Sequence, residues 1–297
     1  MAEPILQDGL IYWEKQSATY NGVLGVSRSS ACRCRLTSLG RWLWLWRTSF
    51  YLSFILALFD ILLVQSLPRV ESLGSRKFLL YLFPQLSTVP STIRPLKPPP
   101  ARRFRALDVG AGIGRVTSDT LLHLVSDVVL LEPVESFIQT AISRGRASAA
   151  APRSSNENKL PLQKQKWKGI SDASKSVTFL QGTLQACDPA NPSNTATFLD
   201  RVGYIPPVPD DDSGFDVVWC QWCLTYMNDT DLIAFFKRSQ AALRKEGPGV
   251  IVVKENLCRD GEGSVPAIHF DKEDSSVTRC VSPSASLLEK FNDAVQI

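Results

Sequence analysis

The stretch LDVGAGIGR, residues 107–115, decides the fold. Its first residues continue an apolar strand pattern over 106–109, and its three alternating glycines open a helical pattern over 114–125. The chain must leave a strand and turn at once into a helix, and glycines permit both that turn and a close approach of backbone N–H groups to a ligand. The G-x-G-x-G spacing differs from the G-x-G-x-x-G of dinucleotide-binding enzymes, although a nicotinamide-binding domain stays open as an alternative.

Two charged residues favour a ligand site at this loop over a plain turn. An apolar run over 128–131 ends at Glu132, where a carboxylate can accept both hydroxyls of a ribose. Arg115 follows the third glycine directly, and its planar fork of donors suits a ligand carboxylate. The second strand and its terminal acid therefore add to the glycine signal.

Strand and helix patterns alternate along the rest of the chain. We predict strands over 177–180, 215–220 and 250–254, helices over 66–86, 137–144 and 229–243, a short helix near 197–202, a proline-rich linker over 87–103 and a flexible insertion over 146–174. This alternation predicts an α/β fold in which a mostly parallel sheet carries helices on both faces.

Composition narrows the classes of function. The 297 residues are 44% hydrophobic, which suits one globular domain with a sizeable core, and the net charge of +4 gives no electrostatic case for a nucleic-acid partner. Seven cysteines without a framework spacing indicate a reducing compartment, so we expect a cytoplasmic protein that also enters the nucleus. Two histidines make a histidine-based metal site improbable, and the lone C-x-x-C at 220–223 is interpreted as structural, so no metal is expected.

Five separated motifs give the chain a family resemblance. They are YWEKQSATYNGVLG at 12–25, LDVGAGIGR at 107–115, FDVVWCQWCLTYMND at 215–229, VVKEN at 252–256 and FDKEDSSVTR at 270–279. In this order they resemble the fungal α N-terminal protein methyltransferases that act on Xaa-Pro-Lys termini. The resemblance covers 12–25 and 67–279. It implies a class I, Rossmann-like methyltransferase fold, S-adenosylmethionine as cofactor, and protein N-terminal peptides as substrates.

The resemblance also implies which residues bind the cofactor. They are Gly110, Gly112, Arg115, Glu132, Pro133, Val134, Leu184, Gln185 and Gln221. Leu184 and Gln185 would border the adenine. Gln221 directly follows the strand over 215–220, at the sheet edge where ligands of open α/β folds bind.

On the substrate side, Trp222 offers a flat apolar face for a proline ring, with a core tryptophan as the alternative. By resemblance, Trp13 belongs to an N-terminal cap over cofactor and peptide. Asp271 would meet the substrate lysine, and Ser276 the N-terminal segment of the peptide. Without the resemblance, the acidic segment 271–276 would be interpreted as a solvated loop.

The proposed chemistry needs a neutral α-amine in line with a methyl donor. An α-amine has a pKa near 8, so deprotonation at neutral pH costs only about 1 kcal/mol, and positioning is the main demand. By resemblance, Asn256 and Asp274 orient the amine. Asp274, with Tyr226 nearby, is the candidate to accept or relay the proton.

Two segments depart from the family pattern. The run WLWLWRTSFYLSFILALFDILL at 42–63 approaches the length of a membrane span, but Arg47 and Asp60 are expensive in lipid, so no membrane partner is expected. Val26-Ser27 after Gly25 fits the start of a retained intron in the gene model, and Gln65 its end. Residues 280–297 do not resemble the family, so the sheet is expected to lack its last two strands.

These boundaries divide the chain into a cap over 1–25, an insert over 26–65, a helix and linker over 66–104, a methyltransferase core over 105–279 and a tail over 280–297. Three other interpretations stay open: a class I methyltransferase for another substrate, a catalytically impaired form, and a membrane-anchored protein.

Overall fold

The computed structural model describes residues 3–23, 68–87, 102–151, 166–210, 213–247, 249–256 and 268–279. The predictions on the 26–65 insert, the apolar run at 42–63 and the 280–297 tail lie outside these residues, as does most of the 87–103 linker. Among the helices of the described ranges, none is long and apolar enough to cross a membrane.

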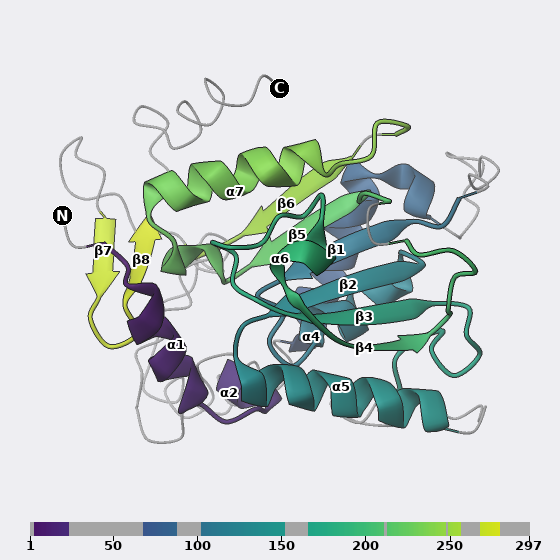
Figure 1. Ribbon diagram of the computed structural model, residues 1–297, viewed down its shortest axis with the longest axis horizontal. Coiled ribbons are helices and arrows are strands. Elements are labelled where there is room, and N and C mark those ends of the chain that lie inside the picture. The colour runs from purple at the N-terminus through teal and green to yellow at the C-terminus, as the bar shows by residue number, and fades with distance from the viewer. Residues whose placement is uncertain are drawn as a thin grey trace, which may run out of the picture.

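A six-stranded sheet organises the chain, with strand order β4-β3-β2-β1-β5-β6 (Figure 1). The strands are β1 (Arg105–Val109), β2 (Asp127–Glu132), β3 (Ser176–Gln181), β4 (Thr197–Gly203), β5 (Val217–Gln221) and β6 (Val250–Lys254). All neighbours pair in parallel except β3 and β4, which pair antiparallel. The predicted α/β fold with a mostly parallel sheet is confirmed.

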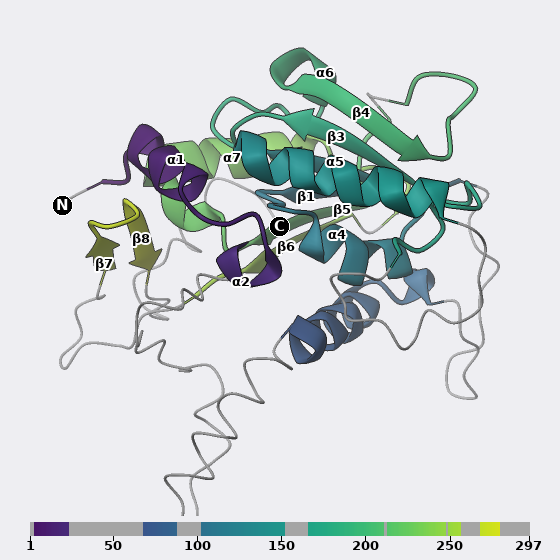
Figure 2. The same cartoon turned by 90° about the horizontal axis from the view of Figure 1, so that it is seen from below.

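Helices cover both faces of this sheet (Figures 1 and 2). The helical elements are α1 (Leu6–Glu14), α2 (Tyr20–Val23), a helix at 68–82, α4 (Arg115–Asp119), α5 (Glu135–Ala150), α6 (Pro192–Thr195), α7 (Asp229–Ala241) and the short 3₁₀ turns Pro84–Leu86, Leu121–His123 and Leu224–Tyr226. A separate hairpin of β7 (Ile268–Asp271) and β8 (Ser276–Arg279) lies with α1 at the end of the sheet where the parallel strands finish (Figure 1).

Alternation along the strands builds two hydrophobic layers. Ala106, Val128 and Trp219 belong to a core with the helix at 68–82, α4 and α5. Their neighbours Leu107 and Val129 belong to a second core with α7. Strands β1 and β2 are buried on both faces, so their sequences are nearly continuous apolar runs. Such runs can be recognised as strands from the sequence.

The predicted short helix near 197–202 is wrong, because this segment is the edge strand β4. The helix there, α6, lies at Pro192–Thr195. Thr197 to Gly203 pair with β3 through a register that runs from Thr197 opposite Gln181 to Gly203 opposite Ser176. Strand β4 is at the edge of the sheet and is partly exposed to solvent, so that even Phe198 is 55% exposed. Pairing with β3, rather than local propensity, decides this structure.

The predicted flexible insertion over 146–174 is also wrong at both ends. Helix α5 continues to Ala150, and residues 166–174 fold back against the core. Trp167 is buried there, with its ring centroid 6.0 Å from that of Phe179 and the Arg144 guanidinium 5.6 Å from its own ring. One aromatic residue thus anchors a segment whose composition is otherwise polar.

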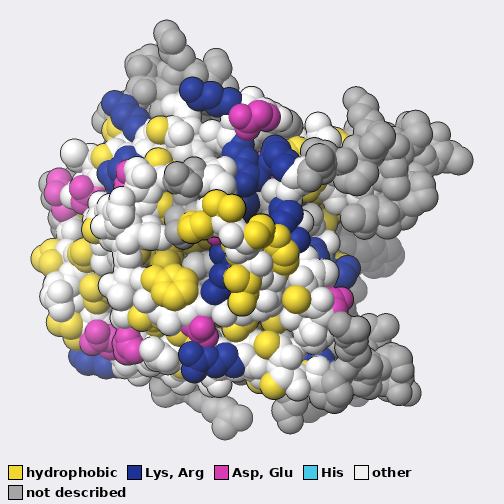
Figure 3. Space-filling view, turned by 45° about the vertical axis from the view of Figure 1, so that its right-hand side comes forward, with side chains coloured by type: hydrophobic (Ala, Val, Ile, Leu, Met, Phe, Trp, Pro, Cys, Tyr) yellow, Lys and Arg dark blue, Asp and Glu magenta, His cyan; other side chains and the backbone are white. Residues whose placement is uncertain are grey.

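The amino ends of the strands carry paired charges. Arg103 bonds the buried Asp127 at 2.7 Å, and Arg244 bonds the buried Asp216 at 2.8 Å. With this side turned forward, Figure 3 shows Lys and Arg side chains running across the surface between hydrophobic and acidic ones. These ion pairs connect residues at the amino ends of the strands, the end of the sheet opposite the glycine loop.

We expect the Trp167→Ala variant to lose about 3–5 kcal/mol of unfolding free energy, because it leaves a cavity between α5 and β3. Urea denaturation followed by circular dichroism measures this loss. The matched control is Lys168→Ala, which changes the exposed neighbouring side chain and should stay close to wild type. A loss below about 1 kcal/mol for Trp167→Ala would show that the 166–174 segment is not part of the core.

Candidate functional site

The glycine loop between β1 and α4 has the backbone that its sequence predicts. Gly110, Gly112 and Gly114 have φ angles of +60°, +57° and +74°, a region that side chains other than glycine disfavour. A Cβ atom on Gly110 would lie 2.4 Å from the Cβ of Cys223. Both the left-handed backbone and the close approach of the β5 end therefore require glycine at position 110.

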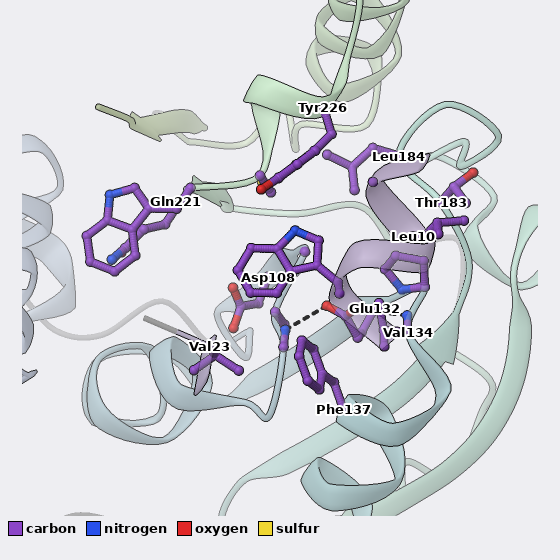
Figure 4. A pocket seen from close by; sticks show the side chains of 18 of the residues that line it. Leu10, Val23, Asp108, Glu132, Val134, Phe137, Thr183, Leu184, Gln221 and Tyr226 are labelled. Carbon is purple, nitrogen blue, oxygen red and sulfur yellow. Dashed lines mark hydrogen bonds between the residues drawn. The ribbon is translucent and has the colours of Figure 1, made fainter. Parts of the chain in front are cut away.

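Glu132 ends β2 and closes the loop from the other side. Its Oε2 accepts the N–H of Gly112 at 2.7 Å (Figure 4). Its Oε1 accepts the N–H of Val134 at 2.9 Å. Burial raises the pKa of Glu132 to about 7, although these two N–H groups favour the ionised form. A carboxylate has about four lone-pair positions, so Glu132 retains capacity to accept ligand hydroxyls.

A cavity of about 950 Å³, measured to its open mouth, lies above this loop. All nine residues predicted to bind the cofactor line it: Gly110, Gly112, Arg115, Glu132, Pro133, Val134, Leu184, Gln185 and Gln221. Figure 4 shows Gln221 at one end of the cavity and Thr183 and Leu184 toward the other. A long ligand with one polar and one apolar end would fit this layout.

Arg115 enters the cavity from the first turn of α4. Its Nη1 donates to Oε2 of Glu71 on the helix at 68–82, and its guanidinium lies 5.1 Å from the Trp222 ring centroid. Burial alone would raise the pKa of Glu71, but Arg115 and Lys254 outweigh it and lower the pKa to about 2. Glu71 is therefore a carboxylate, and sequence reasoning missed it because no local motif surrounds it.

Asp108, inside the glycine motif, is a second buried acid of the cavity. Thr117 Oγ1 donates to its Oδ2 at 2.6 Å. Burial raises the pKa of Asp108 to about 7 despite that bond and the nearby Arg115 charge. Asp108 lines the cavity although it was not among the predicted site residues.

The opposite wall of the cavity comes from α1 and the turn after β5. Trp13 contacts Phe137 and Tyr226 edge to face, with ring centroids 6.1 and 6.2 Å apart. The Tyr226 hydroxyl donates to Oδ2 of Asp274 at 3.0 Å. Burial, and then the Asp274 charge, raise the pKa of Tyr226 above its usual range, so the phenol keeps its proton. Tyr226 therefore connects the cavity to Asp274.

Trp222 lines the cavity, so the alternative of a core tryptophan does not hold. Its backbone is left-handed, with φ +57°, and its N–H donates to the carbonyl of Lys254 at 3.0 Å. Glu255 Oε1 accepts the next two N–H groups, of Cys223 and Leu224, both at 2.8 Å. This carboxylate thereby holds the turn that presents Trp222 and Tyr226.

Four predicted residues, Asn256, Asp271, Asp274 and Ser276, are not part of the cavity lining. Asn256 is exposed just past β6, and Asp271 is exposed, where its Oδ1 accepts the N–H of Glu273 at 2.8 Å. Ser276 is buried, and its N–H donates to Oδ1 of Asp274 at 3.0 Å. Asp274 sits in the β7–β8 turn and reaches the cavity through Tyr226, so the predicted roles of these residues stay predictions.

Sequence reasoning missed most of the apolar lining. The lining residues that were not predicted come from the cap, from the glycine loop and the helices after β1 and β2, and from the turns after β3 and β5: Leu6, Gly9, Leu10, Val23, Ala111, Val116, Phe137, Thr183, Cys223 and Met227. The cap contacts could have been sought in the periodicity of 6–13, where Leu6, Leu10 and Trp13 recur at helical spacing. Cys220 and Cys223 are buried thiols whose pKa burial raises well above the usual range.

Comparison with known proteins places the chain beside methyltransferases. The model of a family described as AdoMet dependent proline di-methyltransferase matches residues 66–169 and 195–296. The second matched segment extends beyond Arg279, the last residue of the family resemblance in the sequence analysis. Alpha N-terminal protein methyltransferase 1 of Schizosaccharomyces pombe is 31% identical over 226 residues, which are 76% of this chain and 72% of that protein.

Other relatives, which match a smaller share of the chain, agree. Alpha N-terminal protein methyltransferase 1 of Arabidopsis thaliana is 32% identical over 59% of this chain, and human N-terminal Xaa-Pro-Lys N-methyltransferase 1 is 26% identical over 59%. The chain spans about half the length of these two relatives, at 45% and 54%. A solved SAM-dependent methyltransferase from Leishmania major has a TM-score of 0.53 at 22% identity, covering 97% of this chain and 72% of that one, which shows a shared fold.

The buried Glu132 predicts a pH-dependent stability. Its pKa rises from 4.5 in the unfolded chain to about 7 in the folded protein, so the stability contributed by the neutral acid is fully present below about pH 4.5 and is lost as the pH rises through 7. Between these values, the unfolding free energy of wild type should fall relative to Glu132→Gln by about 1.4 kcal/mol per pH unit.

Urea denaturation of the ligand-free proteins between pH 5 and 8 measures this difference. The Glu135→Gln variant, which changes an exposed carboxylate three residues along the chain, is the matched control. A difference between wild type and Glu132→Gln that stays constant with pH would contradict the assigned cause.

Proposed function

The chain belongs to the AdoMet dependent proline di-methyltransferase family, and from this premise we propose that it transfers methyl groups from S-adenosylmethionine to the α-amine of protein N-termini. The observation that carries the proposal is one cavity with two chemical halves. The glycine loop, Glu132 and Arg115 form one half, and Trp13, Trp222 and Tyr226 form the other.

The residues of the first half fit S-adenosylmethionine. Glu132 lines the cavity with a carboxylate for ribose hydroxyls, Arg115 offers donors for the methionine carboxylate, and Leu184 and Val134 give apolar surface for the adenine. When bound, the cofactor supplies an electrophilic methyl group on a sulfonium. The chain then has to bring an amine in line with that methyl and to exclude competing water.

The second half supports a peptide acceptor. Trp222 lines the cavity with its ring centroid 5.1 Å from the Arg115 guanidinium, and we propose that its apolar surface packs against a proline ring. The relatives from Homo sapiens and Danio rerio are named for Xaa-Pro-Lys termini, and we propose the same class of sequence here. Asp271, at the end of β7, and Asp274, in the β7–β8 turn, would attract the cationic amine and the following lysine.

Asp274 is the proposed proton acceptor. Its Oδ2 already accepts the Tyr226 hydroxyl and its Oδ1 the Ser276 N–H, so the carboxylate is held in one orientation beside the cavity. Tyr226 keeps its proton, so it holds the carboxylate as a donor and does not itself remove a proton. The amine therefore passes its proton toward Asp274, and Asn256 and Ser276 would orient the peptide from the same side.

Cytoplasm and nucleus remain the proposed location. The described cysteines, Cys187, Cys220 and Cys223, are free thiols, which supports a reducing compartment. The described part of the chain adds no argument for a nucleic-acid or membrane partner.

The proposed function is tested by mass spectrometry after incubation with S-adenosylmethionine and a peptide that begins Ala-Pro-Lys. We expect methylation of the α-amine, observed as added methyl masses on the N-terminal fragment ions. The same peptide with an acetylated N-terminus is the control and should stay unmodified. Methylation confined to the lysine side chain would contradict the proposal, and binding of cofactor without any peptide methylation would favour a class I methyltransferase for another substrate.

For Asp274→Asn we expect a drop in kcat of about 100-fold or more, because an amide cannot accept the proton. The matched control is Glu273→Gln, which changes an exposed acid on the same turn and should keep its activity. Initial rates at saturating cofactor measure both variants. Unchanged turnover in Asp274→Asn would remove Asp274 from the mechanism.

A further inference from the structure

One buried carboxylate behind the cavity remains without a role. Glu71, on the helix at 68–82, does not line the cavity, and its side chain is 7% exposed. It nevertheless bonds two side chains that do line it, Arg115 and Gln221. These come from different elements, the start of α4 and the end of β5.

The contacts of Glu71 divide between its two oxygens. Oε2 accepts from Nη1 of Arg115. Oε1 accepts from Gln221 Nε2 at 3.1 Å, Lys254 Nζ at 2.6 Å and Ser75 Oγ at 2.7 Å. A buried carboxylate is costly unless it is paired, and these four donors offset that cost. The cluster therefore keeps one fixed arrangement.

This arrangement determines how Gln221 faces the ligand. Trp219 Nε1 donates to Gln221 Oε1 at 3.1 Å, and Gln221 Nε2 donates to Glu71. Both ends of the Gln221 amide are therefore bonded. Its oxygen accepts from Trp219 and its nitrogen donates to Glu71, and this fixes the orientation of the amide. Without Glu71, the Nε2 end would lose its partner among the described residues.

The arrangement also leaves Arg115 with capacity for a ligand. Among the described residues, its Nη1 bonds Glu71, while Nε and Nη2 carry donors that can meet a carboxylate in the cavity. Glu71 balances one of the two cations that contact it, Arg115 and Lys254. The cluster of Glu71, Arg115 and Lys254 thus carries one net positive charge, and the remaining Arg115 donors suit an anionic ligand group.

We infer that Glu71 is a positioning residue for the amino-acid end of the methyl donor, acting through Arg115 and Gln221. This inference rests on the proposed function, because it assumes that the cavity binds S-adenosylmethionine. It goes further in assigning a residue outside the cavity to one part of that ligand. The adenosine end lies with Glu132 and Leu184, which Glu71 does not contact.

Two ligands separate this role from a general structural one. S-adenosylhomocysteine carries the amino-acid end, whereas 5′-methylthioadenosine lacks its carboxylate and ammonium groups. For Glu71→Gln, isothermal titration calorimetry should show about 10- to 100-fold weaker binding of S-adenosylhomocysteine, as expected for loss of a charge-assisted hydrogen bond. Binding of 5′-methylthioadenosine should change less than about 3-fold.

The matched control is Lys77→Gln on the same helix. It also removes one charge, but from an exposed side chain outside the Glu71 cluster, so both ligands should bind nearly as in wild type. Thermal unfolding of each variant without ligand shows what fraction is folded, and affinities refer to that fraction.

The outcomes are distinct. Weaker S-adenosylhomocysteine binding with unchanged 5′-methylthioadenosine binding supports the inference. Equal weakening of both ligands would assign Glu71 a structural role, and tighter S-adenosylhomocysteine binding would show that Glu71 competes with the ligand for Arg115. Either result overturns the inference while the proposed function stands. If wild type binds neither ligand, the proposed function fails and the inference fails with it.

Discussion

The hydrogen bond from the Gly112 N–H to the Glu132 carboxylate is the interaction on which the site depends. It joins the loop after β1 to the end of β2, at 2.7 Å, and it forms only because the glycines take left-handed backbone angles. The same bond fixes Glu132 with its oxygens at the cavity wall. The parallel register of β1 and β2 places Val109 beside Leu131, so the two strands end together and the loop and the acid meet. Sheet pairing is therefore the cause of the site geometry.

Burial gives these acids their electrostatic character. Asp108 and Glu132 both have pKa values raised to about 7, because the low-dielectric surroundings penalise the charge. Glu71 is less deeply buried, with a side chain that is 7% exposed, and its pKa is lowered to about 2, because Arg115 and Lys254 surround it. Paired and unpaired carboxylates thus have opposite shifts within one site. The pairing partner, rather than depth alone, decides the protonation state.

Features that depend on residues close together in the chain could be predicted from the sequence. The nine cofactor residues all line the cavity: the glycine motif and the end of the next strand indicate Gly110, Gly112, Arg115 and Glu132, and the family resemblance implies the other five. Strand β4 could not be found this way, because an edge strand with one open face lacks the continuous apolar run of β1 or β2. Trp167 is a lone aromatic in a polar segment, so its burial against Phe179 depends on the fold. The Glu71–Arg115 pair spans 44 residues, and no motif connects its members.

The two halves of the site differ in how the chain stabilises them. The half around Glu132 belongs to the central strands, which are buried on both faces. The half around Tyr226 is completed by α1, in which Gly9 is the buried residue, and by the β7–β8 hairpin. These peripheral parts meet through the Ile5 N–H and Ser275 Oγ at 2.9 Å, across a separation of 270 residues, and a Cβ on Gly9 would lie 3.1 Å from the Tyr226 ring. Helix α1 adds apolar contacts of its own, because Leu10 and Trp13 pack against the cluster that contains Val134 and Phe137. The cofactor half is therefore built on the central strands, whereas the peptide half is assembled from parts of the chain that are far apart in the sequence.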